Sequence, residues 1–429
     1  MKHVLSLTGL ALSVLLLPTA RAQEALVVYA FDQGLDAILR IEDVNGDGDT
    51  LDAGEVRRFF DDSVPLTGTD NSQGLFALGP NTLLATDNFT PDNVVFLDDL
   101  NGDGDAFDAN ENAVWFDGAL PNGYTLTNPV NLSLGLDGAI YMIDNNTLDT
   151  DNPEAVYRLE DLNGDGDVND AGESSEYFRL SPPDIIGATT FDIEFDAAGA
   201  GYVLDITDPN QIESIDRIAP DASAKTEWID SSDLLSLAGY VFSGMNELTY
   251  LPGTDEIVVG AASLSGSTRI IALKDRNGND RIDQSNEVRL LWSEASHADG
   301  YNTGYARDIF RCPDDSLIWC DSLRDRIMRL FDLNGDGDYN DTGETTVVYD
   351  AALAGGAGQE VAEQLLTVTA YPALAACPGD LDGDGDTDQA DLGVLLAAYG
   401  ISDGGDLDDD GDTDQADLGV LLGDYNCGT

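Results

Sequence analysis

Basic side chains are scarce in this sequence of 429 residues. It has 19 lysines and arginines and two histidines, against 82 aspartates and glutamates, and its formal charge is −63. A surface of this kind repels nucleic acid and anionic lipid, and its self-repulsion opposes folding unless counter-ions bind. Salt adaptation would account for part of the acidic excess, but not for the regular spacing described below.

Histidine is nearly absent. His3 lies in an N-terminal segment that we expect to be removed, which leaves His297 alone. Ser-His-Asp and Cys-His catalysis and multi-histidine metal sites are therefore excluded, unless His297 itself serves. Because a lone histidine in a loop is more often an ordinary loop residue than a catalyst, we assign no catalytic residue from the sequence.

Cysteine is also rare, and none of the four residues has the spacing of a zinc site. Three disulfide connectivities are possible. We expect the local one, Cys312 with Cys320 and Cys377 with Cys427, because export favours disulfides and the second pair brackets a distinct C-terminal segment.

Long apolar runs are confined to the N-terminus. Residues 5–17 are apolar but too short to span a bilayer; Lys2 precedes them and the small residues of 20–22 follow. This pattern predicts a signal peptide over residues 1–22. We expect an exported protein, secreted or attached to a cell surface, with no membrane span.

One acidic motif is abundant. DLNGDGDVNDAGE at 161–173 has close copies at 43–55, 99–111 and 332–344, and a weaker copy at 275–287. In the close copies, aspartate or asparagine occupies positions 1, 3 and 5, glycine at 6 permits a sharp turn, and position 7 can offer a backbone carbonyl. This is the donor pattern of an EF-hand loop, with the closing glutamate at position 13 instead of 12.

Four copies in one register predict bound calcium. Magnesium fits less well, because it keeps its waters and requires a strict octahedron. Acidic turns without metal are the alternative, but their carboxylates would repel one another. The predicted ligands in the close copies are Asp43, Asn45, Asp47, Asp49, Asp52, Glu55, Asp99, Asn101, Asp103, Asp105, Asp108, Glu111, Asp161, Asn163, Asp165, Asp167, Asp170, Glu173, Asp332, Asn334, Asp336, Asp338, Asp341 and Glu344.

The weaker copy departs from the pattern. Asp280 replaces the turn glycine and Asn279 replaces an acid, so both a metal-bound and a metal-free loop stay open. Its predicted ligands are Asp275, Asn277, Asn279 and Glu287.

Alternating apolar segments flank each acidic loop, for example AVYRLE before 161–173 and EYFRL after it. Their period of two and their aromatic and β-branched residues predict strands. The metal loop therefore joins two strands of a hairpin, unlike the loop of a helical EF-hand. A further strand pair precedes most hairpins, such as NLSLGLDGAIYMID at 131–144, so the repeating unit has four strands.

Units of roughly 45–60 residues have the scale of propeller blades. A short turn, APDASAK, replaces the metal loop in the unit at 189–232. A split unit combines 25–62 with EQLLTVTAY at 363–371, which would close a ring by pairing the chain ends. The complete units lie near 72–118, 130–181, 189–232, 244–294 and 304–351.

The chain from 23 to 372 therefore resembles a six-bladed β-propeller of no specific family, a mainly β fold with calcium loops in its hairpins. Seven blades and a pair of β-sandwiches are the alternatives.

The pattern changes after Pro372. GDLDGDGDTDQADLGVLLAAYG at 379–400 recurs as GDLDDDGDTDQADLGVLLGDYN at 405–426, with the EF-hand register intact at twelve residues. Each loop leads into a helical segment whose leucines and tyrosine are spaced for one face, Leu392, Leu395, Leu396 and Tyr399 in the first copy and Leu418, Leu421, Leu422 and Tyr425 in the second. The predicted ligands are Asp380, Asp382, Asp384, Asp386, Asp391, Asp406, Asp408, Asp410, Asp412 and Asp417.

This duplicated loop and single helix over 377–427 resembles a type I dockerin domain. The resemblance implies one calcium ion per repeat and docking onto a cohesin module, with Gln389-Ala390 and Gln415-Ala416 at the partner-reading positions. Dockerins usually carry basic residues along the helix, whereas this module has no lysine or arginine. A calcium-stapled cap or a general attachment tag is the alternative.

Three functions are consistent with these patterns. The first is an exported calcium-binding protein with a binding or scaffold role, in which the metal stabilises the fold. The second is a polysaccharide-degrading enzyme tethered through its dockerin-like domain, since a glycosidase needs only two suitably spaced carboxylates. The third is an adhesin that crosslinks through calcium. The expected partners are calcium, a cohesin-like or cell-surface protein, and polysaccharide.

Overall fold

The computed structural model describes most of the chain beyond the expected signal peptide. The described residues are 25–372, apart from 46–49, 62, 64–71, 89–91, 121–122, 124, 146–153, 181–189, 206–212, 243–246, 264–265, 305 and 355–359, together with 381, 387, 389–401, 405, 407 and 413–425.

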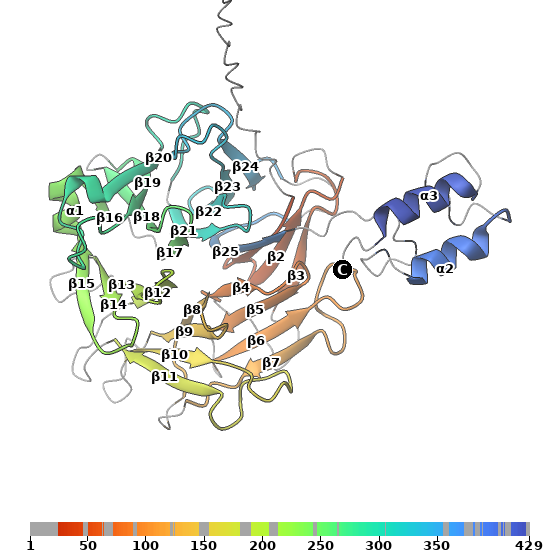
Figure 1. Ribbon diagram of the computed structural model, residues 1–429, viewed down its shortest axis with the longest axis horizontal. Helices are drawn as coiled ribbons and strands as arrows, with labels where there is room; N and C mark the ends of the chain where they lie inside the picture. The colour runs from red at the N-terminus through yellow and green to blue at the C-terminus, as the bar shows by residue number, and fades with distance from the viewer. Residues whose placement is uncertain are drawn as a thin grey trace, which may run out of the picture.

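Six antiparallel sheets are arranged in a ring, and each sheet is one blade of a β-propeller (Figure 1). The strands of each blade are given from the channel outward. Blade 1 consists of β25 (Leu365–Pro372), β1 (Leu26–Asp32), β2 (Ala37–Glu42) and β3 (Val56–Asp61), blade 2 of β4 (Leu75–Ala77), β5 (Thr82–Asp87), β6 (Asn93–Asp98) and β7 (Asn112–Phe116), and blade 3 of β8 (Pro129–Leu134), β9 (Ile140–Asp144), β10 (Ala155–Leu159) and β11 (Ser174–Arg179). Blade 4 consists of β12 (Thr190–Phe195), β13 (Gly201–Asp205), β14 (Ser214–Ile218) and β15 (Lys225–Asp230), blade 5 of β17 (Leu248–Leu251), β18 (Glu256–Ser263), β19 (Thr268–Leu273) and β20 (Val288–Ser293), and blade 6 of β21 (Ala306–Arg311), β22 (Leu317–Asp321), β23 (Arg326–Leu330) and β24 (Thr345–Asp350).

The six-bladed prediction is confirmed, and the alternatives of seven blades and of two sandwiches are wrong. Blade 5 also carries elements that the sequence analysis missed. The long strand β18 pairs with β17 and, further along, with β16 (Tyr240–Phe242). The helix α1 (Ser231–Ala238) leads into β16, and the short 3-10 helix η1 (Ser285–Glu287) precedes β20.

The core of the propeller lies between its blades. The apolar clusters among the described residues number six, and each joins two neighbouring blades. The middle strands face a neighbour on both sides, so β1, β9 and β22 are buried along their whole length. The outer strand β11 is half-exposed or exposed at nearly every residue, as expected for a blade edge. The ring is therefore stabilised by contacts between blades.

Closure of the ring depends on the two ends of the propeller sequence. β25 pairs antiparallel with β1, with Val28 opposite Ala370, as the split sixth unit predicted. The buried carboxylate of Asp32 accepts hydrogen bonds from three backbone amides at this closure, those of Leu35 (2.7 Å), Glu363 (2.7 Å) and Gln364 (2.8 Å). One side chain thus ties the N-terminal strand to the C-terminal one.

The expected disulfide between Cys312 and Cys320 is wrong. Both thiols are free and buried in the apolar cluster between blades 6 and 1. Cys320 lies on β22 opposite Asp308, whereas Cys312 follows β21 in a turn, with its amide bonded to Ser316. The two cysteines therefore do not face each other across the hairpin, and burial raises the pKa of Cys312 to about 12. Cys377 and Cys427 lie outside the described residues.

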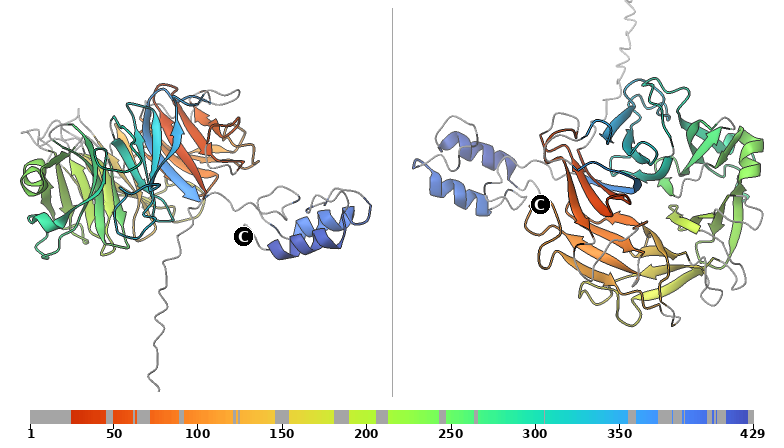
Figure 2. Two further views of the ribbon diagram at one scale, coloured as in Figure 1. Left: turned by 90° about the horizontal axis from the view of Figure 1, so that it is seen from above. Right: turned by 180° about the vertical axis from the view of Figure 1, so that it is seen from behind.

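The C-terminal part forms two helices, α2 (Gln389–Ala398) and α3 (Gln415–Asp424), which lie together outside the ring (Figures 1 and 2). The apolar residues that are spaced for one face differ in their burial. Leu395 and Leu421 are fully buried, but Leu396 and Leu422, together with Tyr399 and Tyr425, are exposed. No described helix is long and apolar enough to cross a membrane.

Substitution of Asp32 tests the closure of the ring. Asp32→Asn puts an amide group against backbone donors, so we expect a loss of about 2–3 kcal/mol in the free energy of unfolding. Urea unfolding followed by tryptophan fluorescence measures this loss. Glu363→Gln removes a charge from an exposed side chain beside the same closure and serves as the control. Equal stability of the two variants would show that Asp32 does not hold the chain ends.

Candidate metal-binding loops

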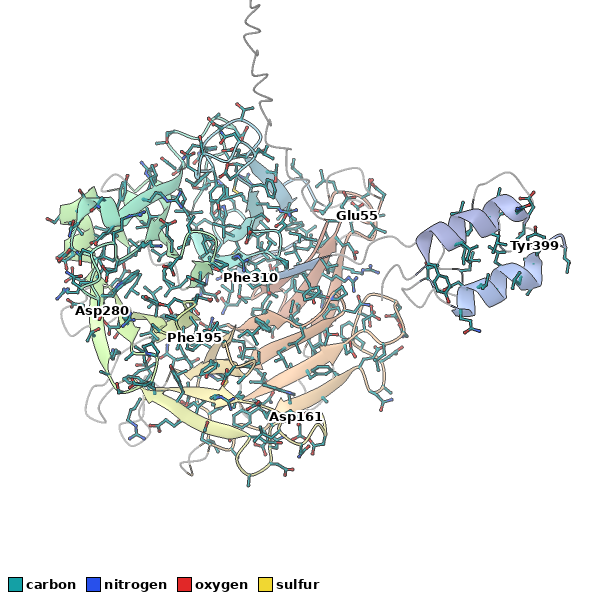
Figure 3. The ribbon with its side chains drawn as sticks, viewed as in Figure 1. Glu55, Asp161, Phe195, Asp280, Phe310 and Tyr399 are labelled. Carbon is teal, nitrogen blue, oxygen red and sulfur yellow. The ribbon has the colours of Figure 1, made fainter. Side chains whose placement is uncertain are left out.

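The acidic loops join the third and fourth strands of their blades, at the outside of the ring. Glu55, Asp161 and Asp280 belong to three of these loops, and all three lie far from the ring centre (Figure 3).

The loop at 99–111 curls around its own side-chain oxygens. Asp99 accepts hydrogen bonds from the amides of Gly102 (2.7 Å) and Gly104 (2.8 Å). Asn101 accepts one from Asp103 (2.8 Å). Both glycines have positive φ, +75° and +92°, a conformation that other residues rarely adopt. The predicted ligands at positions 1, 3 and 5 therefore lie along one tight curl.

The same curl recurs in two further loops. Asp161 accepts from Gly164 (2.6 Å) and Gly166 (3.0 Å). These backbone donors lower the pKa of Asp161, because they stabilise its ionised form. In blade 6, Asp332 makes the equivalent bonds at 2.6 and 2.9 Å. Three loops thus have the same backbone geometry.

The closing glutamates hold the two ends of each loop together. Glu111 is buried and accepts from the amides of Leu100 (3.2 Å) and Asp108 (3.0 Å), one at each carboxylate oxygen. A carboxylate oxygen has a second lone pair, which leaves each of them able to bind a cation as well. The equivalent buried glutamates, each accepting backbone N–H groups at both oxygens, are Glu55, Glu173, Glu287 and Glu344.

The weaker copy has the same curl as the other loops, but arginine side chains form ion pairs beside it. Asp275 accepts from Gly278 (2.7 Å) and from Asp280 (2.7 Å), which takes the glycine position with φ +62°. The Asp280 carboxylate lies 3.4 Å from the guanidinium of Arg217 in blade 4. Arg281 bonds to Glu227 of the same neighbouring blade at 2.7 Å. Two ion pairs therefore connect this loop to blade 4.

One cluster of three carboxylates, Glu227, Asp230 and Asp233, lies within 4.8 Å in the described part of the chain, and it is outside the acidic repeats. Arg281 is paired with Glu227 and with Asp233 (3.5 Å), and Asp230 caps the start of α1. These acids already have partners. The loops at 99–111 and 161–173 would also bind through asparagine and backbone carbonyl oxygens, which this three-carboxylate cluster does not represent.

Several predicted ligands lie outside the described residues, namely Asp47, Asp49, Asp380, Asp382, Asp384, Asp386, Asp406, Asp408, Asp410 and Asp412. In the C-terminal loops the closing acids are described. Asp391 and Asp417 are fully buried and accept the amides of Leu381 (2.8 Å) and Leu407 (2.6 Å). These bonds match those of the closing glutamates in the propeller.

Each acidic loop also binds the neighbouring blade. The outer strand of every blade has a β-bulge, which leaves one residue unpaired in the ladder. In blade 1 that residue is Phe59, and its carbonyl accepts the amide of Ala106, the eighth residue of the blade 2 loop, at 2.9 Å. We call this contact between an eighth loop residue and a bulge the clasp. The remaining clasps are Val168 to Trp115, Ile282 to Trp228, Tyr339 to Leu291, and the hydroxyl of Thr50 to Val348.

Blade 4 has no acidic loop and makes no clasp to blade 3. The backbone bonds of its turn join Ala219 to Ala224 and to Ala222, within the turn itself. Among the described residues, a different pair of side chains links these blades at the start of β12. Asn145 donates to the carbonyl of Thr190 (3.0 Å), and Glu154 accepts its amide (2.7 Å). Burial raises the pKa of Glu154 to about 7.

His297, the sole histidine beyond the expected signal peptide, has a structural position. It is buried against Trp292, with ring centroids 4.7 Å apart. Nδ1 lies 3.0 Å from the carbonyl of Ser293, and Nε2 accepts the amide of Tyr301 at 2.6 Å. Both ring nitrogens are therefore engaged, which argues against a catalytic role.

A second group of acids was missed by the sequence analysis. Asp192, Glu194, Glu247 and Asp308 lie on or beside the innermost strands, in the segments FDIEF, NELTYL and ARDIFR. The sequence signal that could have revealed them is an acidic residue within an apolar strand segment that is expected to be buried. Burial raises the pKa of all four, that of Glu194 to about 8.

No protein-family model and no curated protein matches the sequence. Several solved structures are similar at low identity. A periplasmic gluconolactonase of Pseudomonas aeruginosa is 11% identical, with a TM-score of 0.44 over 81% of this chain and 98% of that one. A putative 6-phosphogluconolactonase of Bacteroides fragilis is 10% identical, with a TM-score of 0.43 over the same shares of the two chains. A virginiamycin B lyase of Staphylococcus aureus is 14% identical, with a TM-score of 0.36 over 78% and 86%. Likeness at this level assigns no activity.

The contribution of the junction between blades 3 and 4 to the free energy of unfolding should depend on pH. The folded-state pKa of Glu154, about 7, lies above the unfolded value of about 4.5, so folding favours its protonated form. Stability should therefore fall as pH rises from about 4.5 through 7, by a total on the order of 3 kcal/mol. Glu154→Gln should abolish this part of the pH dependence in chemical unfolding between pH 4.5 and 8. Glu176→Gln, on the outer strand of the same blade, should keep it, and a Glu154→Gln profile parallel to wild type would contradict the assignment.

Proposed function

We propose that this protein is an exported, calcium-binding propeller with an extracellular binding or scaffold role, in which calcium holds the blades together. The clasp is the observation that carries this proposal. The residue that enters the neighbouring blade follows directly after the predicted ligands at positions 1, 3, 5 and 7. An ion that fixes the curl also fixes the clasp.

Electrostatics gives the reason for a metal. The acids of each loop are drawn into one curl, where ionised carboxylates repel one another. Asp105 lies in such a curl, and burial and its acidic neighbours raise its pKa. A bound calcium ion replaces this repulsion with attraction. Because the ion binds the folded loop alone, its binding energy adds to the stability of the ring.

We further propose that residues 377–427 form a dockerin-like attachment module. Two observations support it. Asp391 and Asp417 close the two loops in the same way, and the two helices expose the same pair of residue types, Leu396 with Tyr399 and Leu422 with Tyr425. Equivalent exposed apolar side chains on both helices would offer one docking surface in two orientations. A cohesin-like or cell-surface protein would be the partner.

Removal of a single loop charge should have opposite effects with and without calcium. Asp165→Asn should cut calcium affinity of its loop about tenfold, which lowers the free energy of unfolding in calcium by about 1.4 kcal/mol. In chelator the same change should be neutral or stabilising, because it relieves repulsion. Asp221→Asn, in the blade 4 turn without a metal loop, is the matched control. Equal effects of Asp165→Asn in both buffers would mean that this loop is an ordinary turn.

Hydrogen exchange locates the effect in the structure. Calcium should increase protection of the clasp amides of Ala106, Val168 and Tyr339, and should leave the blade 4 turn at 219–224 unchanged. A uniform change over all blades would contradict a role for the clasps.

The second candidate is a polysaccharide-degrading enzyme. One observation favours it: Glu194 and Glu247 line a hollow of about 240 Å³ at the ring centre, and the pKa of each is raised by burial. A carboxylic acid of raised pKa can serve as a general acid beside a second carboxylate. Release of reducing ends from a glycan panel, lost in Glu194→Gln, would support this activity. Absence of turnover on every glycan would leave the binding role.

A further inference from the structure

The centre of the ring contains acids from three consecutive blades. Asp192 lies on β12, Glu247 directly precedes β17, and Asp308 lies on β21. Contacts between the inner strands bring them together. Asp192 accepts a hydrogen bond from the amide of Leu248, the residue after Glu247. Burial and the charge of nearby Asp308 raise the pKa of Glu247, so these two groups lie close together.

In each aspartate, one carboxylate oxygen accepts a backbone hydrogen bond and the other accepts none from the described residues. Oδ2 of Asp192 accepts from Leu248, and Oδ2 of Asp308 accepts from the amide of Val368 at 2.5 Å. Oδ1 of both aspartates is buried and accepts no hydrogen bond from any described residue. An unpartnered buried carboxylate oxygen costs several kcal/mol unless a proton, a water molecule or a cation binds it. Two of them beside one glutamate form an incomplete coordination site.

Arginines near the channel do not balance these acids. Arg311 is bound to Asp315 at the mouth of blade 6. Arg307 shares a narrow hollow with Glu247. Two guanidinium groups, one of them already bound to Asp315, therefore stand beside a group of four acids. The remaining negative charge requires protons or a bound cation.

A hollow with space for an ion adjoins Glu247. The hollow of about 240 Å³ reaches Glu247 and is also lined by Asn131, Ser133 and Phe310. Phe310 lies near the middle of the ring in Figure 3. Several water molecules fit into such a volume, so an ion in it could keep part of its hydration.

We propose that the central channel binds a hard divalent cation between the carboxylates of Asp192, Glu247 and Asp308. The two aspartates supply ligands from fixed inner strands. In the described structure the three groups do not all approach within 4.8 Å, so Glu247 reaches the ion by a change of rotamer or through a water molecule. Oxygen ligands of this charge suit calcium or manganese. The site is separate from the acidic loops and does not depend on their binding calcium.

Such an ion would have a structural consequence. The blades that supply its ligands are 4, 5 and 6, and the ion would join their inner strands as the clasps join outer ones. It would also present an open coordination position to the hollow, where an anionic or hydroxyl group of a ligand could bind.

Calcium stoichiometry of three variants tests the site. Equilibrium dialysis with radioactive calcium should give one ion fewer per chain in Asp308→Asn and in Glu247→Gln than in wild type. Glu194→Gln removes a charge from the same hollow without removing a proposed ligand, and it should keep the wild-type number. Circular dichroism confirms that each variant is folded. An unchanged number in both ligand variants would overturn the proposal.

Crystals of the wild-type protein soaked in manganese provide a test that needs no variant. Anomalous density beside Asp192 and Asp308 would support the site, and an empty channel would overturn it. The two proposals fail separately. If the loops bind no calcium, wild type should bind one ion and Glu247→Gln none, whereas a failed channel site would leave the loop ions in every variant.

Discussion

The clasp between neighbouring blades is the contact on which the other features of this propeller depend. A bulge on each outer strand leaves a carbonyl without a ladder partner. The adjacent blade supplies the missing donor from the eighth residue of its acidic loop, as Ala106 does for Phe59. That residue can reach the bulge because the preceding seven residues are wound into a curl around aspartate and asparagine oxygens. The repeated aspartates thus belong to the loop geometry that joins neighbouring blades at the rim.

The contacts that join neighbouring blades differ from one junction to another. Five junctions have a clasp, and the junction between blades 3 and 4 relies on Asn145 and Glu154 at the start of β12. The clasp between blades 4 and 5 belongs to the weaker loop, in which Asp280 pairs with Arg217 of blade 4 and Arg281 pairs with Glu227 of blade 4. Blade 4 thus differs from the other blades in having no acidic loop, and the two ends of the propeller sequence pair in blade 1.

Negative charge is concentrated both at the rim and in the channel, but the two groups of acids have different surroundings. At the rim, backbone amides and solvent stabilise the ionised groups, as at Asp161. In the channel, burial removes the solvent, and Oδ1 of Asp192 and of Asp308 lacks even a backbone donor. The cations that we propose would stabilise both groups of acids, with ligands from one loop at the rim and from separate blades in the channel.

The sequence alone determined the elements that depend on local spacing. The period-two strands, the repeated four-strand unit, the split blade that joins 25–62 to 363–371, and the glycines of the acidic curls could all be read from neighbouring residues. Pairing of Cys312 with Cys320 was wrong because proximity in sequence does not fix the direction of two side chains across a hairpin. Only the tertiary structure decided that the eighth loop residues enter the next blade, and that Asp192, Glu247 and Asp308 lie on neighbouring inner strands or beside them at the centre. These acids are about sixty residues apart in the chain, and they come together only because the ring closes.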